Sequence, residues 1–322
     1  MRILVTGGRG FVGGRISEYL WRKGHQVVIG SRQHKHPPIW LAESETALLN
    51  FDEQSSLRQA CANVEVVIHA AGMNAQDCAA NPEAALISNG IHTTRLLSEA
   101  CYEGVKRFIY ISTAHVYANP LVGIINEQTC TTNLHPYATS HYAGECAVLN
   151  ANQRDQTDGI VLRLSNAVGA PMEQDANCWM LLVNDLCKQA VQAKQLTLQS
   201  DGSQVRDFIS LDAVCKVVST LVEGRLGERV GGIYNLGSGI SQTVLEVAQL
   251  VQQRCALILG FSPPIARKLP QYAQQSMPLH YQQTALSEIG IAPISNIVQE
   301  VDALLVYCKK AFAVNGQKNA PL

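Results

Sequence analysis

The sequence lacks a strong excess of charge of either sign. Among its 322 residues, lysine and arginine nearly balance aspartate and glutamate, and the formal net charge is −1. A balanced chain exerts no broad attraction on nucleic acid or on an anionic membrane, so neither is predicted as a partner. Only 16% of the residues are charged and 47% are hydrophobic, which argues against disorder and supplies a large core.

Long apolar runs and paired cysteines are also missing. No apolar stretch approaches the roughly 18 residues that a membrane-spanning helix needs, and the glycines after "MRILVT" interrupt any signal-peptide core. The ten cysteines are scattered without a C-x-x-C pair, which argues against a zinc site and against a disulfide framework. We therefore expect a cytoplasmic protein with reduced thiols and no bound metal.

Short apolar runs alternate with helical patterns through the first half of the chain. Strands are predicted at 2–7, 26–31, 64–71, 107–113 and 159–165, and helices at 12–24, 93–104 and 142–154. Continuous apolar strands alternating with helices are typical of a doubly wound parallel sheet with helices on both faces. The predicted fold is α/β and Rossmann-like, with a nucleotide-binding domain over 1–165.

After residue 166 the pattern loosens, which indicates a smaller α/β lobe over 166–312 that binds the substrate. A helix is predicted near 177–193, a hairpin at 196–210, helices from Leu211 and Thr243, a strand at 231–239 and an irregular connection at 262–280. Segments near 205–240 are expected to contribute to the first domain. Residues 313–322 are expected to fray.

The segment "VTGGRGFVGGRI" places Gly7, Gly10 and Gly13 between the first strand and the first helix. The first glycine permits a tight turn, the second lets the backbone approach a pyrophosphate, and the third permits close helix packing. The start of the helix offers free N–H groups to phosphate oxygens. In this strand–turn–helix context, the glycines predict a dinucleotide-binding site.

An acidic residue is missing at the end of the second predicted strand. Such a residue would bind the adenosine ribose and favour NAD, but the chain reads "VVIGSRQHK", with Ser31 followed by Arg32 and Lys35. Arg9, in the glycine turn, is predicted to reach the same region. Because arginine pairs with phosphate through two donors, these residues favour the 2′-phosphate of NADP(H). NAD(H), with the cations on a solvated loop edge, is the alternative.

An ordered series of motifs resembles the extended short-chain dehydrogenase/reductase family of nucleotide-sugar epimerases, dehydratases and reductases. The series consists of "TGGRGFVG" (6–13), "HAAG" (69–72), Asn89, "VKRFIYISTAHVY" (105–117), "PYATSH" (136–141), "RLSNAVGAP" (163–171), "GSQVRDFISLDAV" (202–214) and "YNLGSG" (234–239). The resemblance covers about residues 1 to 310. It implies an NAD(P)-dependent enzyme, a nucleotide-sugar substrate and a homodimer formed by the helices at 93–104 and 142–154.

The resemblance also implies roles for individual residues. Thr113 would hydrogen-bond the reacting oxygen, Tyr137 would transfer its proton, and Asn89 and His141 would complete the catalytic group. Cofactor contacts would come from Gly7, Arg9, Gly10, Phe11, Val12, Gly13, Ser31, Arg32, Asn50, Phe51, Ala70, Ala71, Gly72, Ile111, Tyr137 and His141, with Asn50 and Phe51 near the adenine. Substrate contacts would come from Thr113, His115, Asn166, Arg206 and Arg267.

His141 stands where the family's Tyr-x-x-x-Lys motif has lysine, and this is the main departure from the family. An unperturbed histidine has a pKa of roughly 6.5, so it is mostly neutral at pH 7 and stabilises a tyrosinate less than an ammonium does. Three interpretations remain open. Tyr137 acts as a protonated acid in reduction, or Glu145 holds His141 charged from one turn further on, or the chain binds its ligands without catalysis.

The residues after Thr113 argue against dehydration. Dehydratases of the family carry Asp-Glu there, whereas this chain has Ala114 and His115. Epimerases of the family commonly hold NAD tightly, whereas an NADP(H)-like pocket favours net reduction. We therefore predict an NADPH-dependent reductase of a keto group, at C4, on a nucleotide-linked deoxysugar. A nucleotide-sugar 4-epimerase is the alternative, and Arg163 is expected in a structural ion pair.

Overall fold

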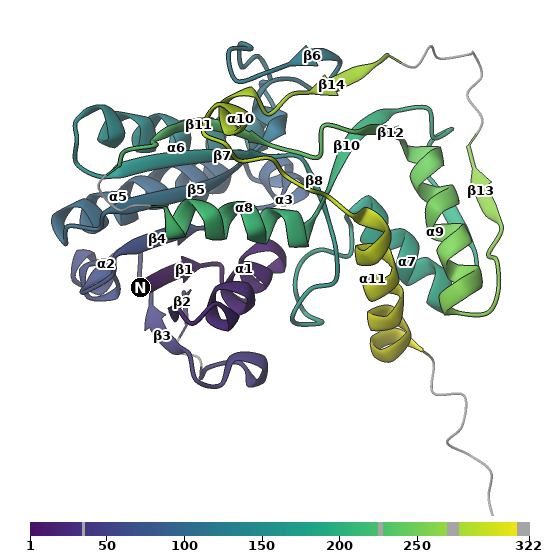
Figure 1. Ribbon diagram of the computed structural model, residues 1–322, viewed down its shortest axis with the longest axis horizontal. Helices are drawn as coiled ribbons and strands as arrows, with labels where there is room; N and C mark the ends of the chain where they lie inside the picture. Colours follow the sequence, from purple (N-terminus) through teal and green to yellow (C-terminus); the bar gives the residue numbers. More distant parts are fainter. Residues whose placement is uncertain (34–35, 225–227, 269–276, 314–322) are drawn as a thin grey trace, which may run out of the picture.

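The computed structural model describes residues 1–33, 36–224, 228–268 and 277–313, and its larger lobe is built on a seven-stranded sheet (Figure 1). In spatial order the strands are β11 (Gly232–Leu236), β7 (Asp158–Leu164), β5 (Arg107–Thr113), β4 (Val66–His69), β1 (Arg2–Thr6), β2 (Gln26–Ser31) and β3 (Glu45–Leu48). Every neighbouring pair runs parallel. The predicted α/β class and its doubly wound parallel sheet are confirmed.

Helices cover both faces of this sheet. On one face α1 (Phe11–Arg22) and α8 (Leu211–Glu223) share a core with β1, and on the other α2 (Gln54–Cys61), α5 (His92–Tyr102) and α6 (Pro136–Gln153) pack together. Each strand of the centre is therefore buried on both sides. This explains why β5 reads as a continuous apolar run with every residue buried.

The smaller lobe has its own sheet and its own core. Its three-stranded sheet joins β8 (Asn166–Val168), β10 (Val205–Ser210) and β12 (Ser241–Thr243). Around it pack α7 (Leu182–Gln192), α9 (Val244–Ile258) and α11 (Ile297–Phe312), which appear at the right of Figure 1. Two ribbons pair β9 (Leu196–Leu198) with β13 (Ile265–Arg267), and β6 (Gly123–Ile125) with β14 (Leu279–Tyr281).

Short helical turns complete the connections. They are η1 (Ile39–Leu41), α3 (Ala75–Ala80), α4 (Pro82–Ala85), the π-helical η2 (Leu86–Ile91), η3 (Ala114–Val116) and α10 (Thr284–Glu288). The segment from α3 to η2 leads from the end of β4 to the start of α5. It places Asn89 against α6, with which η2 makes extensive contact.

The two lobes are tied together at α1. The Arg15 guanidinium donates to both carboxylate oxygens of Glu300 on α11, at 3.0 and 2.8 Å, and also donates to the carbonyl of Ala170. The Glu300 carboxylate in turn accepts from the backbone N–H of Asp212 at the start of α8. This bidentate pair is partly buried, so it fixes the smaller lobe against the helix that follows the glycine turn.

The hairpin predicted at 196–210 is wrong. The strands β9 and β10 form there, but β9 pairs with β13, while β10 pairs with β8 and β12. The connecting loop is tied to the start of α9, because the carbonyls of Gly202 and Gln204 accept hydrogen bonds from Leu245 and Val244. These bonds hold the two strands in different sheets.

Other sequence predictions need smaller corrections. The helix expected near 177–193 begins only at Leu182, and the connection at 262–280 contains β13 and β14. The elements β3 and α2 were not predicted, because both are short and only partly buried. Lys35 and residues 314–322 of the predicted frayed tail lie outside the described residues.

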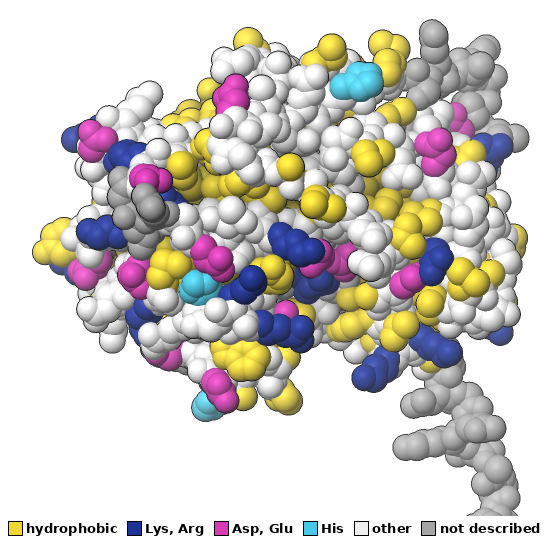
Figure 2. Space-filling view, viewed as in Figure 1, with side chains coloured by type: hydrophobic (Ala, Val, Ile, Leu, Met, Phe, Trp, Pro, Cys, Tyr) yellow, Lys and Arg dark blue, Asp and Glu magenta, His cyan; other side chains and the backbone are white. Residues whose placement is uncertain are grey.

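Charges of both signs are interspersed on the face drawn in Figure 2, in agreement with the balanced composition. Within the described ranges, no helix combines the length and the apolarity needed to cross a bilayer. The same residues contain no group of three or more histidine, cysteine, aspartate or glutamate side chains arranged to hold a metal ion.

Candidate active site

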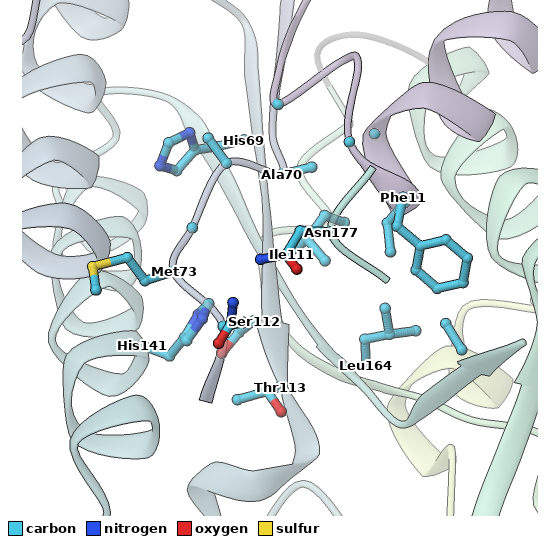
Figure 3. Close-up of a pocket in the computed structure, with 18 of the residues that line it drawn as sticks. Phe11, His69, Ala70, Met73, Ile111, Ser112, Thr113, His141, Leu164 and Asn177 are labelled. Atoms are coloured by element: carbon cyan, nitrogen blue, oxygen red, sulfur yellow. The ribbon is translucent and has the colours of Figure 1, made fainter. Parts of the chain in front are cut away.

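A cavity of about 790 Å³ lies at the carboxyl ends of the sheet strands, between the two lobes. Its lining comes from the glycine turn, from the ends of β2, β4, β5 and β7, from α6 and from β10. Figure 3 shows Met73 and His141 on one side of it and Phe11 and Leu164 on the other. Ligands of doubly wound sheets bind in this place, where the connections of β1 and β4 leave in opposite directions.

The glycine turn forms the cavity wall below the start of α1. Gly7 has a φ of +64°, and its carbonyl accepts a hydrogen bond of 2.8 Å from the N–H of Gly10. A Cβ on Gly13 would lie 2.3 Å from the Gly7 oxygen, so the helix approaches the turn closely only because this residue has no side chain. No side chain in the described part of the chain caps the start of α1, so its first N–H groups remain available to a phosphate.

The far end of the cavity carries an aromatic pair. The rings of Phe51 and His92 stack with centroids 4.3 Å apart, and both residues line the cavity beside Ser31 and Arg32. Asn50, which was predicted beside Phe51, is not part of the lining formed by the described residues. Its side-chain oxygen instead accepts the backbone N–H of Asp52 at 3.2 Å, which stabilises the turn before α2.

Arg9 lines the cavity but is already engaged in an ion pair. Its guanidinium lies 2.7 Å from the carboxylate of Glu173 and donates to the carbonyl of His36 at 3.1 Å. The indole N–H of Trp40 donates to the same carboxylate at 3.1 Å. Glu173 therefore connects the glycine turn, the loop after β2 and the loop after β8. Of the predicted phosphate-binding cations in the described residues, Arg32 is exposed and Arg9 is neutralised.

A chain of buried hydrogen bonds supports the loop after β4. The Thr93 hydroxyl donates to the Asn89 carbonyl, so its oxygen accepts the Nε2 proton of His69 at 2.9 Å, while the Thr6 hydroxyl bonds Nδ1 at 2.6 Å. These partners suit a neutral ring, and burial lowers the pKa of His69 to about 3. His69 thus anchors Ala70, Ala71 and Gly72 on the cavity wall.

Asn89, which was predicted as a member of the catalytic group, does not line the cavity formed by the described residues. Its side chain is fully buried behind the wall, where the oxygen accepts the N–H of Met73 at 2.8 Å and the amide donates to Ser140 at 3.0 Å. Both polar ends are therefore occupied by the protein. Asn89 joins the loop after β4 to α6, and we treat it as a positioning residue.

Thr113 and Tyr137 both line the cavity, from the end of β5 and the first turn of α6. The Thr113 side chain accepts the backbone N–H of His115 at 3.2 Å, which starts the turn η3 and fixes the hydroxyl at the strand end. Burial raises the pKa of the Tyr137 phenol, and the neighbouring Thr113 hydroxyl partly opposes this rise. No cation is among the described residues that shift the pKa of Tyr137.

His141 lies one helical turn after Tyr137, and the two rings meet edge to face with centroids 4.7 Å apart. The His141 ring is buried, and burial lowers its pKa to about 4, so the ring is neutral at pH 7. Its Nδ1 atom lies 2.9 Å from the hydroxyl of Tyr110 on β5. The family's ammonium group is thus replaced by an uncharged ring.

The interpretation that Glu145 holds His141 charged is wrong. The Glu145 carboxylate is fully buried and binds Arg163, with Oε2 at 2.6 Å from the guanidinium, while the Ser112 hydroxyl donates to Oε1 at 2.5 Å. The carboxylate therefore has its own cation and donor. This pair also confirms that Arg163 serves in a structural ion pair.

Three of the predicted substrate contacts, His115, Asn166 and Arg206, line the cavity. Arg206 is exposed on β10, partial desolvation at the cavity lowers the pKa of its guanidinium, and no carboxylate in the described residues binds it. Burial and, secondarily, Arg206 lower the pKa of His115. Arg267 is not among the described residues that line this cavity: it is exposed on β13, where it donates to the carbonyl of Asp201 at 3.3 Å.

Residues 3–237 match the model of the NAD dependent epimerase/dehydratase family. The chain belongs to this family. It is an enzyme of the extended short-chain dehydrogenase/reductase type, as the ordered motifs indicate.

Individual relatives of this family carry out different reactions. A dTDP-glucose 4,6-dehydratase of Streptomyces niveus is 24% identical over 308 residues, covering 91% of this chain and 88% of the relative. A UDP-glucose 4-epimerase of Rhizobium leguminosarum bv. trifolii is 26% identical over 269 residues, covering 78% of this chain and 81% of the relative. The UDP-glucose 4-epimerase of Bifidobacterium longum, solved with NAD⁺ and UDP, has a TM-score of 0.79 and 25% identity, covering 97% of this chain and 99% of the other.

Within this epimerase/dehydratase fold, sequence reasoning missed several cavity residues. His92 stacks on Phe51 at one end, and Asn177 and Met180 reach the cavity from the loop after β8. His92 directly precedes the predicted helix 93–104, but a single histidine there gives no specific signal. The glycine and proline of the loop after β8 predict that it is irregular. They do not predict which of its residues contact the cavity.

Proposed function

We propose that the protein reduces a keto group at C4 of a nucleotide-linked deoxysugar, with Tyr137 as the proton donor. The observation that carries this proposal is the buried His141 ring packed edge to face on Tyr137, at 4.7 Å between centroids, where the family has lysine; burial lowers the pKa of His141 and raises that of the Tyr137 phenol. A protonated phenol is the form needed to donate a proton to a ketone oxygen. The reverse reaction needs a phenolate, and no nearby cation in the described residues stabilises one.

The residues of the chain divide the reaction between them. A nicotinamide cofactor, bound along the glycine turn, would supply the hydride that adds to the carbonyl carbon. Thr113 donates a hydrogen bond to the carbonyl oxygen, and Tyr137 transfers its proton to that oxygen, so that the product is an alcohol. Both side chains come from rigid elements, the end of β5 and the start of α6, which holds their spacing fixed.

Arg206 and Asn166 support a nucleotide-sugar substrate. Arg206 presents an uncompensated guanidinium at the cavity, and the Asn166 side chain donates to the Asp207 carbonyl at 2.8 Å, which fixes its orientation at the lining. A diphosphate offers the charge and the oxygen acceptors that a guanidinium pairs with. The relatives named for dTDP-glucose and UDP-glucose support the same substrate class.

The pH dependence of the two reaction directions tests this proposal. With NADPH and a panel of 4-keto-6-deoxy nucleotide sugars, kcat/KM should stay nearly constant between pH 6 and 9, because the raised pKa of Tyr137 keeps the phenol protonated. Oxidation of the corresponding alcohol should fall about tenfold for each unit of decreasing pH, since the phenolate fraction falls in that proportion. Both rates are followed by absorbance of the reduced cofactor.

Two results would contradict the proposal. A reductive rate that titrates between pH 6 and 8 would mean that Tyr137 ionises near neutrality, as expected beside a cation. Binding of NADPH with no oxidation on any keto sugar would favour a non-catalytic binding protein. The panel should therefore be run with both cofactors and with equilibrium binding measured in parallel.

A 4-epimerase is the second candidate, and the epimerases among the relatives support it. An epimerase uses its cofactor in both directions within one turnover, so it needs no free exchange of cofactor. Interconversion of two nucleotide sugars at catalytic amounts of NAD⁺, without net change in absorbance of the reduced cofactor, would favour this function. Cofactor retained through purification would agree with it.

The cofactor is proposed to be NADP(H), with Arg32 as the main cation for the 2′-phosphate and Ser31 in place of a carboxylate. The Glu173 carboxylate opposes this preference because it neutralises Arg9. Replacing Glu173 by glutamine should therefore lower the Kd for NADPH about 2- to 5-fold, the scale of a partly exposed ion pair, and leave the Kd for NADH unchanged. Glutamine keeps an oxygen for the indole N–H of Trp40.

Fluorescence titration of both reduced cofactors measures this change. Arg32→Ala is the opposing variant, which should weaken the binding of NADPH and leave the binding of NADH unchanged. Equal shifts for both cofactors in Glu173→Gln would show that Glu173 acts through the shape of the loop and not through its charge.

A further inference from the structure

The hydroxyl of Tyr110 lies directly behind His141, on the side away from the cavity. Tyr110 is fully buried on β5, and its oxygen lies 2.9 Å from Nδ1 of His141 and 3.3 Å from the carbonyl oxygen of Asn89. The Tyr110 and His141 rings also stack, with centroids 5.8 Å apart. On its other side Tyr110 stacks on His69, whose two nitrogens are already bonded to threonines.

A glycine on α6 leaves the space for this hydroxyl. A Cβ on Gly144 would lie 2.8 Å from the Tyr110 oxygen and 2.7 Å from the Asn89 carbonyl oxygen. Any larger residue at this position would displace the phenol from His141. The hydroxyl, the glycine and the histidine therefore form one packed unit, in which the tyrosine reaches the imidazole from the adjacent strand.

The geometry fixes where the single proton of the phenol goes. Burial keeps Tyr110 protonated by raising its pKa well above the usual value. Its one O–H has two acceptors within reach, and the imidazole Nδ1 at 2.9 Å is the closer one. An Nδ1 that accepts this proton leaves the neutral ring with its own proton on Nε2.

Because Nδ1 is the ring nitrogen turned toward Tyr110 and His141 lines the cavity, Nε2 is the nitrogen left on the cavity side. The Cε1–Nε2 edge of the ring packs beside Gly72, since a Cβ on Gly72 would lie 3.5 Å from Cε1 and 3.6 Å from Nε2, and both residues line the cavity. The Tyr137 ring meets His141 edge to face on the same side. A donor in this place is available to a cofactor hydroxyl, whereas the opposite tautomer would present only an acceptor.

We propose that Tyr110 is a positioning residue that holds His141 as the Nε2–H tautomer, so that Nε2–H donates to a hydroxyl of the nicotinamide ribose. The proposal deepens the proposed cofactor-dependent function and rests on it for the ribose contact. Tyr110 itself touches neither cofactor nor substrate. A lysine ammonium carries three donors and needs no such support. A neutral imidazole has its proton on only one nitrogen, and the hydrogen bond from Tyr110 determines which one.

Nitrogen-15 NMR of histidine-labelled protein tests the tautomer without any turnover. The His141 signals are identified by their loss in His141→Asn, and we expect Nδ1 to be unprotonated and Nε2 to be protonated. In Tyr110→Phe the two nitrogens should move toward averaged shifts, as the ring samples both tautomers. The Kd for the reduced cofactor should rise about 2- to 10-fold, the range that loss of one hydrogen bond gives, with kcat less affected.

Tyr117→Phe is the matched control. Tyr117 is also fully buried, and its hydroxyl donates to Asn235 at 2.7 Å, away from His141. This variant should leave the His141 shifts and the cofactor Kd unchanged. A change as large as in Tyr110→Phe would show that general loosening, and not the bond to His141, is responsible.

Other outcomes would overturn the proposal. A protonated Nδ1 in the wild-type protein would mean that His141 donates to Tyr110, and identical shifts in Tyr110→Phe would mean that Tyr110 does not set the tautomer. If the wild-type protein binds neither cofactor, the proposed function and the ribose contact both fail. The NMR shifts of the free protein would then still decide whether Tyr110 controls His141.

Discussion

Replacing Tyr137 by phenylalanine is expected to lower kcat for ketone reduction about 10²- to 10⁴-fold, the range that a positioned general acid contributes. The phenol is the acid of the proposed reaction, and its raised pKa keeps it protonated throughout the neutral range. Phenylalanine retains the ring that meets His141 edge to face. The cofactor Kd should therefore change little, and the loss should appear in kcat.

Tyr142→Phe is the control for this variant. Tyr142 lies on the same helix, α6, but its side chain is 43% exposed and is not part of the cavity lining in the described residues. Loss of the Tyr142 hydroxyl should leave both kcat and the cofactor Kd at wild-type values. A loss of less than about tenfold in Tyr137→Phe would mean that the proton comes from another group. Thr113, whose hydroxyl also reaches the cavity, would then be examined next.

The fold of the larger lobe follows from local sequence features. The strands of the sheet centre are short apolar runs, since helices bury both of their faces, and the glycines of the first turn are required by close backbone contacts. Such signals lie within a few residues of one another. The hairpin predicted at 196–210 failed because its strands pair with distant segments, and the pairing partners leave no mark in the local pattern.

The candidate site also has a part that could be predicted from local sequence and a part that depends on distant contacts. Thr113 ends β5, Tyr137 lies in the first turn of α6 and Arg206 lies near the start of β10, and ordered motifs were enough to place all three at the cavity. The burial of Asn89 could not be predicted, because it depends on the π-helical turn η2 and on contacts with α6. The partner of Arg9 lies 164 residues away, and no local rule connects Arg9 with Glu173.

His141 illustrates why a substitution in a motif needs the surrounding structure. The sequence left three interpretations open, and burial together with the Glu145–Arg163 pair removed the one that required a charged imidazole. The neutral ring does not disable the site for reduction, because donation by Tyr137 needs no phenolate. Oxidation would require a phenolate, which a neutral ring stabilises less than an ammonium does, and this is why we propose a reductase.

Arg206→Ala is expected to raise KM for the nucleotide sugar about 10- to 100-fold, because hydrogen bonds to a charged group contribute about 1.5–3 kcal/mol each. The guanidinium faces the cavity without a compensating carboxylate in the described residues, so its charge is directed at an anionic ligand. The cofactor Kd should not change. Arg206→Lys should give a smaller rise in KM, since an ammonium keeps the charge but not the fork of donors.

Arg267→Ala is the control for the two Arg206 variants. KM for all three is measured by initial-rate kinetics at saturating cofactor. Arg267 belongs to the same lobe and is exposed like Arg206, but it lies on β13 outside the cavity lining of the described residues, among which it bonds only the Asp201 carbonyl. Its removal should leave KM within about twofold of wild type, as for surface substitutions generally. If Arg206→Ala has no larger effect than Arg267→Ala, the substrate carries no diphosphate at this wall. The Arg206 guanidinium would then serve another ligand, and His115 would be the next polar side chain of the cavity to test for substrate binding.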